Sequence, residues 1–223
     1  MKTVHVVVEG QTEEGFVNEV LGPHFLARDI YLAPRLIQTA RRSNGRKFAG
    51  GLTFWSHAHD DVRRYLRDTS VAAVTTLFDY YGLPEGTPGL ESRPATADPW
   101  VRVTHVEAAI GASFDHPRFI PHLMLHEFEA YIYVRPSEVA PYVDLPASTA
   151  TIAGQLDGIR DTCGGAERIN ETRITSPSRR LLALWPRYDK VLHGVAITQS
   201  VGLAALRAGC PHFHSWVGRL ESL

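Results

Sequence analysis

The sequence has only two cysteines among its 223 residues, and it lacks any long apolar run. Cys163 and Cys210 are too few and too far apart for a zinc cluster, and in a reducing compartment they are not expected to form a disulfide. No apolar segment approaches the roughly 18 residues that a transmembrane helix needs. The first residues enter a strand-like run rather than a signal-peptide core. We therefore expect a cytoplasmic protein that does not insert into a membrane.

The chain also lacks a net charge large enough to attract nucleic acid as a whole, since its formal charge is -1 at pH 7. The charge is nevertheless segregated, because basic residues outnumber acids between Arg35 and Arg67. Candidate nucleic-acid contacts in this segment are Arg41, Arg42, Arg46 and Lys47. A solvated loop and helix face explains the same pattern equally well.

Apolar, β-branched runs alternate with helical patterns in the first part of the chain, which is typical of a parallel sheet. The predicted strands are 3–8, 30–38, 71–78 and 119–125, and the predicted helices are 12–26, 54–68 and 100–112. Residues 43–51 and 83–99 are predicted loops. Beyond residue 134 only helices are expected, at 137–142, 149–160, 178–185 and 195–208. We therefore predict an α/β core over 1–134, with a parallel-rich sheet flanked by helices, and a helical C-terminal extension over 135–223 packed on that core.

Acidic residues follow three of the predicted strands: Glu9 after the first, Asp79 after the third, and Glu127 with Glu129 after the fourth. Active sites of open α/β sheets lie at the carboxyl ends of the strands. Carboxylates held close together repel one another unless a cation neutralises them, and Mg²⁺ prefers such oxygen ligands. The pattern predicts a Mg²⁺ or Mn²⁺ site. Taken singly, each acid is better explained as a helix cap or a solvated side chain, and only the joint pattern favours a metal site.

The string Val8-Glu9-Gly10-Gln11-Thr12-Glu13 resembles the opening motif of Toprim domains, the fold of topoisomerases, primases and OLD-family nucleases. The resemblance implies that Glu9 acts near the scissile phosphate or binds metal, that Gly10 permits a tight turn, and that Glu13 serves the metal site. The family's second signature is an Asp-x-Asp, but here Tyr81 stands in place of the second Asp of Asp79-Tyr80-Tyr81. Glu127, Glu129 or Glu85 would then supply the missing ligand.

Nearly the whole chain resembles a family of small, stand-alone bacterial Toprim-like proteins. The strings that carry this resemblance are His126-Glu127-Phe128-Glu129-Ala130, Pro177-Ser178-Arg179-Arg180-Leu181 and Tyr188-Asp189-Lys190-Val191-Leu192-His193-Gly194. The resemblance implies an ABC-class ATPase partner and a role in phage or plasmid defence, as for OLD nucleases. Lys190 is the candidate cation for a phosphate or developing charge, Arg179 and Arg180 are candidate phosphate contacts, and His193 is a candidate general acid or base. A surface position for Lys190 is the equal alternative.

These features favour a metal-dependent nuclease of DNA or RNA. A non-catalytic, nucleic-acid-binding or regulatory subunit of an ATPase is the alternative, and phosphoryl transfer on a small phosphate compound is a third. Homodimer formation is left open. The eleven histidines favour zinc less, because spacings such as His122-x₃-His126 do not by themselves supply three or four tetrahedral ligands.

Overall fold

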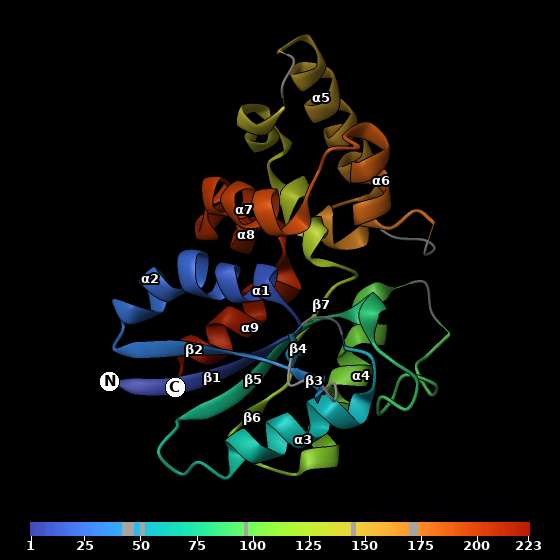
Figure 1. The fold of residues 1–223 in the computed structure, drawn as a ribbon. Coiled ribbons are helices and arrows are strands. Elements are labelled where there is room, and N and C mark those ends of the chain that lie inside the picture. The colour runs from blue at the N-terminus through green and yellow to red at the C-terminus, as the bar shows by residue number, and fades with distance from the viewer. Residues whose placement is uncertain (42–46, 50–51, 96–97, 144–145, 170–173) are drawn as a thin grey trace. The chain divides into compact units, whose positions relative to one another are not determined.

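The computed structural model describes residues 1–41, 47–49, 52–95, 98–143, 146–169 and 174–223. They form two compact units, one of residues 1–124 with 221–223 and one of residues 125–220. The sequence prediction draws this boundary ten residues later, after residue 134. The first unit contains a five-stranded sheet, and the second is built of helices (Figure 1). The predicted class, an α/β fold with a parallel sheet and a helical C-terminal region, is confirmed.

The sheet of the first unit is parallel throughout. Its strands are β1 (Lys2–Val8), β2 (Ile30–Leu36), β5 (Ala73–Asp79), β6 (Phe119–Ile120) and β7 (Leu123–Met124). The order is β2-β1-β5-β6, and β7 also pairs with β5. Val8 is the register partner of Leu36 on one side and of Leu77 on the other. The strands β2, β1 and β5 therefore have their carboxyl ends at the same edge of the sheet.

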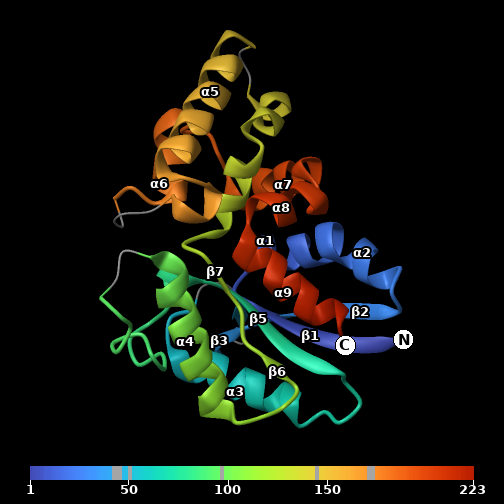
Figure 2. The same cartoon turned by 180° about the vertical axis from the view of Figure 1, so that it is seen from behind.

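Both faces of the sheet are covered by helices, which explains the unbroken apolar run in β1. A continuous helical segment made of α1 (Gln11–Phe16), the π-helix η1 (Val17–Leu21) and α2 (Gly22–Leu26) covers one face. The helices α3 (Trp55–Leu66) and α4 (Pro99–Phe114) cover the other (Figures 1 and 2). Val6 and Val7 point to opposite faces and are both fully buried, because neither face meets water.

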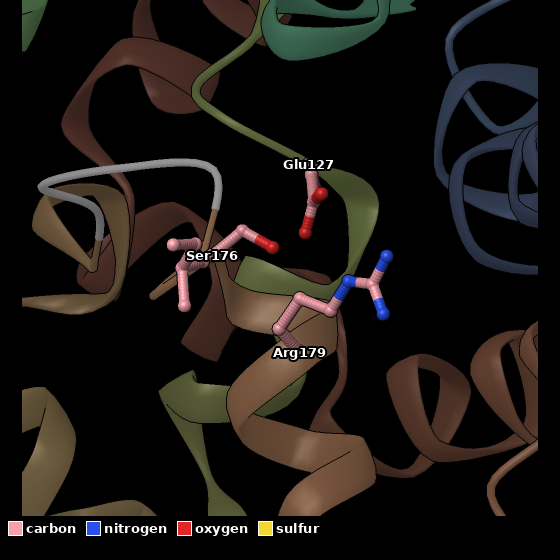
Figure 3. A pocket seen from close by; sticks show the side chains of 4 residues that line it. Glu127, Ser176 and Arg179 are labelled. Carbon is pink, nitrogen blue, oxygen red and sulfur yellow. The ribbon is translucent and has the colours of Figure 1, made fainter.

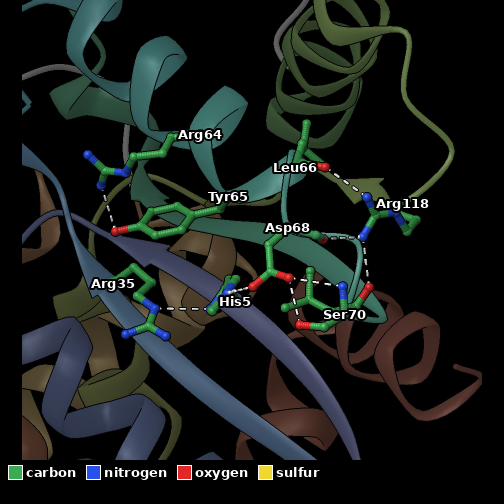
Figure 4. A network of polar contacts seen from close by, with 9 residues as sticks. His5, Arg35, Arg64, Tyr65, Leu66, Asp68, Ser70 and Arg118 are labelled. Atoms are coloured by element: carbon green, nitrogen blue, oxygen red, sulfur yellow. Dashed lines mark hydrogen bonds and ion pairs between the residues drawn. The ribbon is translucent and has the colours of Figure 1, made fainter.

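Polar contacts join the strands to α3 and its following turn (Figure 4). Arg35 Nε donates to Nδ1 of the buried His5 at 3.0 Å, and His5 Nε2 lies 3.7 Å from an Asp68 carboxylate oxygen. Burial, and then the charge of Arg35, lowers the pKa of His5 against the opposing influence of Asp68. Arg118 donates to three backbone carbonyls, those of Leu66, Asp68 and Val71. These contacts fix the turn between α3 and β5.

Two predicted elements of the first unit are wrong in detail. The run 119–125 is two short strands, because Pro121 has no N–H to donate to the ladder. The predicted loop 43–51 contains β4 (Lys47–Ala49), which pairs in antiparallel fashion with β3 (Gln38–Arg41). Such short strands carry too few alternating residues to be recognised in a sequence.

The second unit is helical over its described residues. Its elements are the 3-10 helices η3 (Phe128–Val134), η4 (Pro136–Tyr142) and η5 (Ala166–Arg168), the π-helix η6 (Lys190–Gly194), and α5 (Pro146–Cys163), α6 (Pro177–Leu184), α7 (Val195–Val201), α8 (Leu203–Gly209) and α9 (Pro211–Glu221). The predicted helix 195–208 is broken at Gly202, whose φ of 80° ends α7. Helix α9 is missing from the prediction. The buried Glu167 carboxylate accepts from two N–H groups at its start, those of His212 and Phe213.

In the described part of the chain, no single helix is long and apolar enough to cross a membrane. One bent pair, Lys190–Val201 with Leu203–Gly209, reaches the necessary length and apolar character only when both helices are counted across an 87° break.

Candidate functional site

Two of the predicted acids meet at the carboxyl edge of the sheet. Glu9 follows β1, and Asp79 is the last residue of the neighbouring strand β5. The Glu9 carboxylate crosses between the strands, and its Oε1 accepts a hydrogen bond of 2.7 Å from the Asp79 backbone N–H. This bond fixes one carboxylate oxygen of Glu9 beside the start of the Asp79 side chain.

Glu13 belongs to the same edge through α1. The helix begins two residues after Glu9, and its first turn contains Glu13 and Glu14, where the positive end of the helix dipole favours negative charge. Glu13 is only 3% exposed. A Cβ added at Gly10 would lie 3.3 Å from Glu13 Oε2, so this carboxylate lies back over the turn that follows Glu9. The absence of a side chain at position 10 leaves room for it.

Gly82 lies close to Glu9 and Asp79. It ends the 3-10 turn η2 (Tyr80–Gly82), which returns the chain past the edge of the sheet. A Cβ at this position would lie 3.5 Å from both Glu9 Oε2 and Asp79 Cβ, and Gly82 itself is exposed. Carboxylate oxygens next to an exposed glycine suit a hard cation such as Mg²⁺, which uses few protein ligands and retains several waters.

The second acid of an Asp-x-Asp signature is absent, as the sequence indicates. Tyr81 occupies its place, and its ring stacks against Tyr80 with a centroid separation of 6.2 Å. Glu85, one predicted substitute, is exposed in the loop after η2. The other two, Glu127 and Glu129, belong to the second unit.

Glu127 lies at a pocket within the second unit. Its Oε2 accepts a 2.9 Å hydrogen bond from the Ser178 N–H and thus caps the N-terminus of α6. The pocket measures about 510 Å³ and is lined by Glu127, Ile174, Ser176 and Arg179 (Figure 3). Arg179 is exposed there, whereas Arg180 donates from Nε to the Thr175 carbonyl at 2.7 Å. Of the two predicted phosphate contacts, Arg179 is therefore the more accessible.

The second unit also brings together Glu129 and Lys190, which stand 61 positions apart in the sequence. Lys190 Nζ lies 3.9 Å from the Glu129 carboxylate and 5.6 Å from the centre of the Phe128 ring. Glu129 is buried and Lys190 is partly exposed. The acidic motif around 127–129 and the basic motif around 190 thus meet, although long-range pairing of this kind has no local sequence signal.

His193 is held by its own helix start and by aromatic rings. Its Nδ1 accepts from the Asp189 N–H at 2.9 Å, which leaves Nε2 to carry the proton of the neutral ring. The Trp185 ring centre lies 4.7 Å from that of His193. This orientation is compatible with a proton-transfer role and equally with packing.

The basic segment is described only in part. Arg42 and Arg46 fall outside the described residues, and for Arg41 and Lys47 the structure gives the backbone pairing between β3 and β4. Sequence reasoning missed Gly82, which resembles an ordinary loop glycine. It also missed the pairing of His122 with Glu107 of α4, at 3.4 Å from Nδ1 to Oε1.

The fold and the strand-edge acids define an α/β protein with a candidate metal site at the carboxyl edge of a parallel sheet. Residues 8–221 match DUF4276, a domain of unknown function, and the chain belongs to that family. Comparison with curated proteins and with solved structures gives no match. The resemblance to Toprim domains stays a prediction.

Proposed function

We propose that the chain is a cytoplasmic Mg²⁺- or Mn²⁺-dependent phosphodiesterase, a nuclease that acts on DNA or RNA. The main support is the contact between Glu9 Oε1 and the Asp79 N–H at 2.7 Å, beside the exposed Gly82. Glu9 and Asp79 stand at the ends of two neighbouring strands, and Glu13 follows in the first turn of α1. Oxygen donors alone, in this number, match the preference of Mg²⁺.

In this proposal Glu9, Glu13 and Asp79 hold the metal. When bound, Mg²⁺ would polarise the scissile phosphate and activate water. The Asp79 N–H orients the Glu9 carboxylate by occupying one lone pair of Oε1, so that the other oxygen faces the Gly82 side. The first turn of α1 stabilises the charge of Glu13.

The second unit, taken by itself, carries the residues that the sequence predicts for phosphate contact and proton transfer. Lys190 supplies positive charge, and its pairing with Glu129 keeps its ammonium group in place. Arg179 contacts phosphate from the accessible pocket of α6. His193 presents Nε2–H as a hydrogen-bond donor to a phosphate oxygen, and it would act as a general acid only after Nδ1 exchanged its contact with the Asp189 N–H for a proton. Glu127 and Glu129, predicted from the sequence as further metal ligands, contact the Ser178 N–H and Lys190 within the second unit.

The test is cleavage of supercoiled and single-stranded DNA and of RNA, with Mg²⁺ or Mn²⁺ and with EDTA as the control. We expect cleavage by the wild type to disappear in Glu9→Gln and in Asp79→Asn. The matched control is Glu19→Gln, because Glu19 is an exposed acid on the same helical segment. Equal cleavage by all three variants would reject the strand-edge site.

The resemblance to OLD-like proteins adds an ABC-class ATPase partner and a role in phage defence to the proposal. The assays are therefore run alone and with any ABC-class ATPase that is found encoded beside the gene. Substrates left intact under both conditions contradict an active nuclease.

Tyr81 favours a second candidate function, a non-catalytic nucleic-acid-binding or regulatory subunit, because it removes one acid of the expected pair. Calorimetric titration with Mg²⁺ and Mn²⁺ separates the two. Heat that is lost in Glu9→Gln supports the metal-dependent enzyme, whereas no heat in the wild type supports the binding subunit. Incubation with free nucleotides, followed by product analysis, tests phosphoryl transfer on small phosphate compounds.

A further inference from the structure

Within the described residues, the pocket of the second unit is lined by two opposite charges that do not pair with each other. Glu127 and Arg179 both border its volume of about 510 Å³. Ligand pockets of roughly 300–1,000 Å³ are typical of small-molecule sites. The Arg179 side chain is exposed. A carboxylate and a guanidinium that face one pocket separately are the complement of a ligand with N–H donors at one end and an anion at the other.

Glu127 keeps the capacity to accept hydrogen bonds from a ligand. Its Oε2 accepts from the Ser178 N–H at 2.9 Å, and no other hydrogen-bond partner of this carboxylate lies in the described part of the chain. A carboxylate has about four lone-pair sites, so it can still accept two parallel N–H groups. Glu127 is partly exposed and borders the pocket, which makes its carboxylate accessible to a ligand.

Two serine hydroxyls supply a donor next to this acceptor. Ser176 lines the pocket, and Figure 3 shows its hydroxyl pointing toward the Glu127 carboxylate. The hydroxyls of Ser176 and Ser178 lie 3.2 Å apart and share one hydrogen, so the pair has a second hydrogen to donate. Ile174 adds apolar surface to the same pocket. The lining therefore combines an acceptor for two N–H groups, an O–H donor and an apolar wall.

Among the common nucleobases, guanine matches this arrangement. Its Watson–Crick edge carries a carbonyl oxygen, then a ring N–H, then an amino group, so two adjacent donors face one way and an acceptor stands beside them. Adenine and cytosine each have a ring nitrogen whose lone pair would face the carboxylate. Uracil and thymine have a single N–H between two carbonyl oxygens. Only guanine offers two adjacent N–H donors to a carboxylate.

We propose that this pocket binds a guanine nucleotide. Glu127 accepts from the ring N–H and the amino group of the base, the serine pair donates to the base carbonyl, and Arg179 contacts the phosphate. The guanine belongs to an unpaired position of a nucleic-acid strand, where the edge of the base is open. That source rests on the proposed function, whereas recognition of a guanine nucleotide does not. Such a pocket adds a base preference, which phosphate contacts alone cannot supply.

The test is calorimetric titration of the full chain, in EDTA, with the monophosphates of guanosine (GMP), inosine (IMP) and adenosine (AMP). IMP differs from GMP only in lacking the amino group, so it loses one hydrogen bond to Glu127. We expect IMP to bind roughly tenfold or more weakly than GMP, because the lost bond is to a charged acceptor, and AMP to bind more weakly still. No binding of GMP, or equal binding of GMP and IMP, overturns the proposal.

Two variants separate the base contact from the phosphate contact. Glu127→Gln keeps the shape of the side chain, but an amide cannot accept both N–H groups, so the variant should bind GMP and IMP equally. Arg179→Gln should weaken GMP roughly tenfold and leave guanosine preferred over inosine. Glu127 also caps α6. If Glu127→Gln fails to fold, the comparison of GMP with IMP in the wild type still decides.

The matched controls are Glu138→Gln and Arg135→Gln. Glu138 is a partly exposed acid and Arg135 an exposed arginine, and both belong to the second unit without lining the pocket. Both variants should bind all three nucleotides as the wild type does. A preference for GMP over IMP that survives in Glu127→Gln contradicts the assignment of the base contact.

Single-stranded thymine oligonucleotides with and without one guanine identify the source of the nucleotide. We expect the guanine-containing strand to bind more tightly, and Glu127→Gln to lose the difference. Glu9→Gln should abolish cleavage and keep the preference for GMP. A chain that cleaves nucleic acid but does not distinguish GMP from IMP refutes the pocket and leaves the proposed function intact. Selective GMP binding by a chain that cleaves nothing upholds the guanine site and removes only its assignment to a substrate strand.

Discussion

Replacing Gly82 with alanine should stabilise the metal-free protein and weaken metal binding at the same time. The backbone of Gly82 is not in the left-handed region, and the new methyl group would lie 3.5 Å from its nearest neighbours, Glu9 Oε2 and Asp79 Cβ, an ordinary contact distance. A tolerated Gly→Ala change stabilises by about 0.4–1 kcal/mol through the unfolded chain. The same methyl group fills the space next to the candidate ligands.

The expected magnitude follows from linkage between binding and folding. At a Mg²⁺ concentration of about 100 times Kd, binding adds about 2.7 kcal/mol to the free energy of unfolding. If the methyl group displaces one oxygen contact and weakens binding about tenfold, the gain falls to about 1.4 kcal/mol. In Mg²⁺, the substitution therefore raises the free energy of unfolding through the unfolded chain and lowers it through weaker metal binding.

Urea unfolding in EDTA and in Mg²⁺ measures both effects. Gly158→Ala is the control, because a Cβ at this position in α5 has no atom within 4 Å, and it should leave the Mg²⁺ increment unchanged. An undiminished Mg²⁺ increment in Gly82→Ala would refute the placement of the metal beside Gly82.

Three further predictions concern charged groups away from the strand edge. Burial, and then the charge of Arg35, lowers the pKa of His5, so below about pH 6.5 the unfolded chain binds a proton at this residue that the folded chain does not bind. The free energy of unfolding should therefore fall as the pH drops below this value. Urea unfolding across this range should show a shallower fall in His5→Gln. Arg118→Met removes three hydrogen bonds to backbone carbonyls and should cost about 2–4 kcal/mol by the same assay. Lys190→Met removes the cation that pairs with the buried Glu129 and should destabilise the protein by about 1–2 kcal/mol, after allowance for the partial exposure of Lys190. If this variant remains folded at the assay temperature but no longer cleaves nucleic acid, Lys190 has a role beyond its pairing with Glu129.

The sheet was predictable from the sequence because its strands are buried on both faces. The run around Val6 is apolar without alternation, and it ends sharply at Glu9. Parallel strands of equal register end at the same edge, so the sequence also predicts that Glu9 and Asp79 are neighbours, and the structure places them in contact. This inference needs only the positions of the strands and the expectation of a parallel sheet. Both follow from the apolar runs and from their alternation with helical patterns along the sequence.

Features that depend on a single backbone group or on distant pairing could not be predicted. The division of the last strand requires knowing that Pro121 falls within the ladder. The capping of α6 by Glu127 joins positions 51 apart, and the capping of α9 by Glu167 joins positions 45 and 46 apart. Such acids look like catalytic candidates in a sequence, although a helix start already uses their charge.

The turn Asp79-Tyr80-Tyr81-Gly82 explains why a site on this edge need not contain the missing acid. A carboxylate at position 81 would add a fourth negative charge to the group formed by Glu9, Glu13 and Asp79, and it would require a second cation to offset the repulsion. Tyr81 removes that charge and stacks on Tyr80 instead. Three carboxylates are sufficient for a single Mg²⁺ that retains several waters.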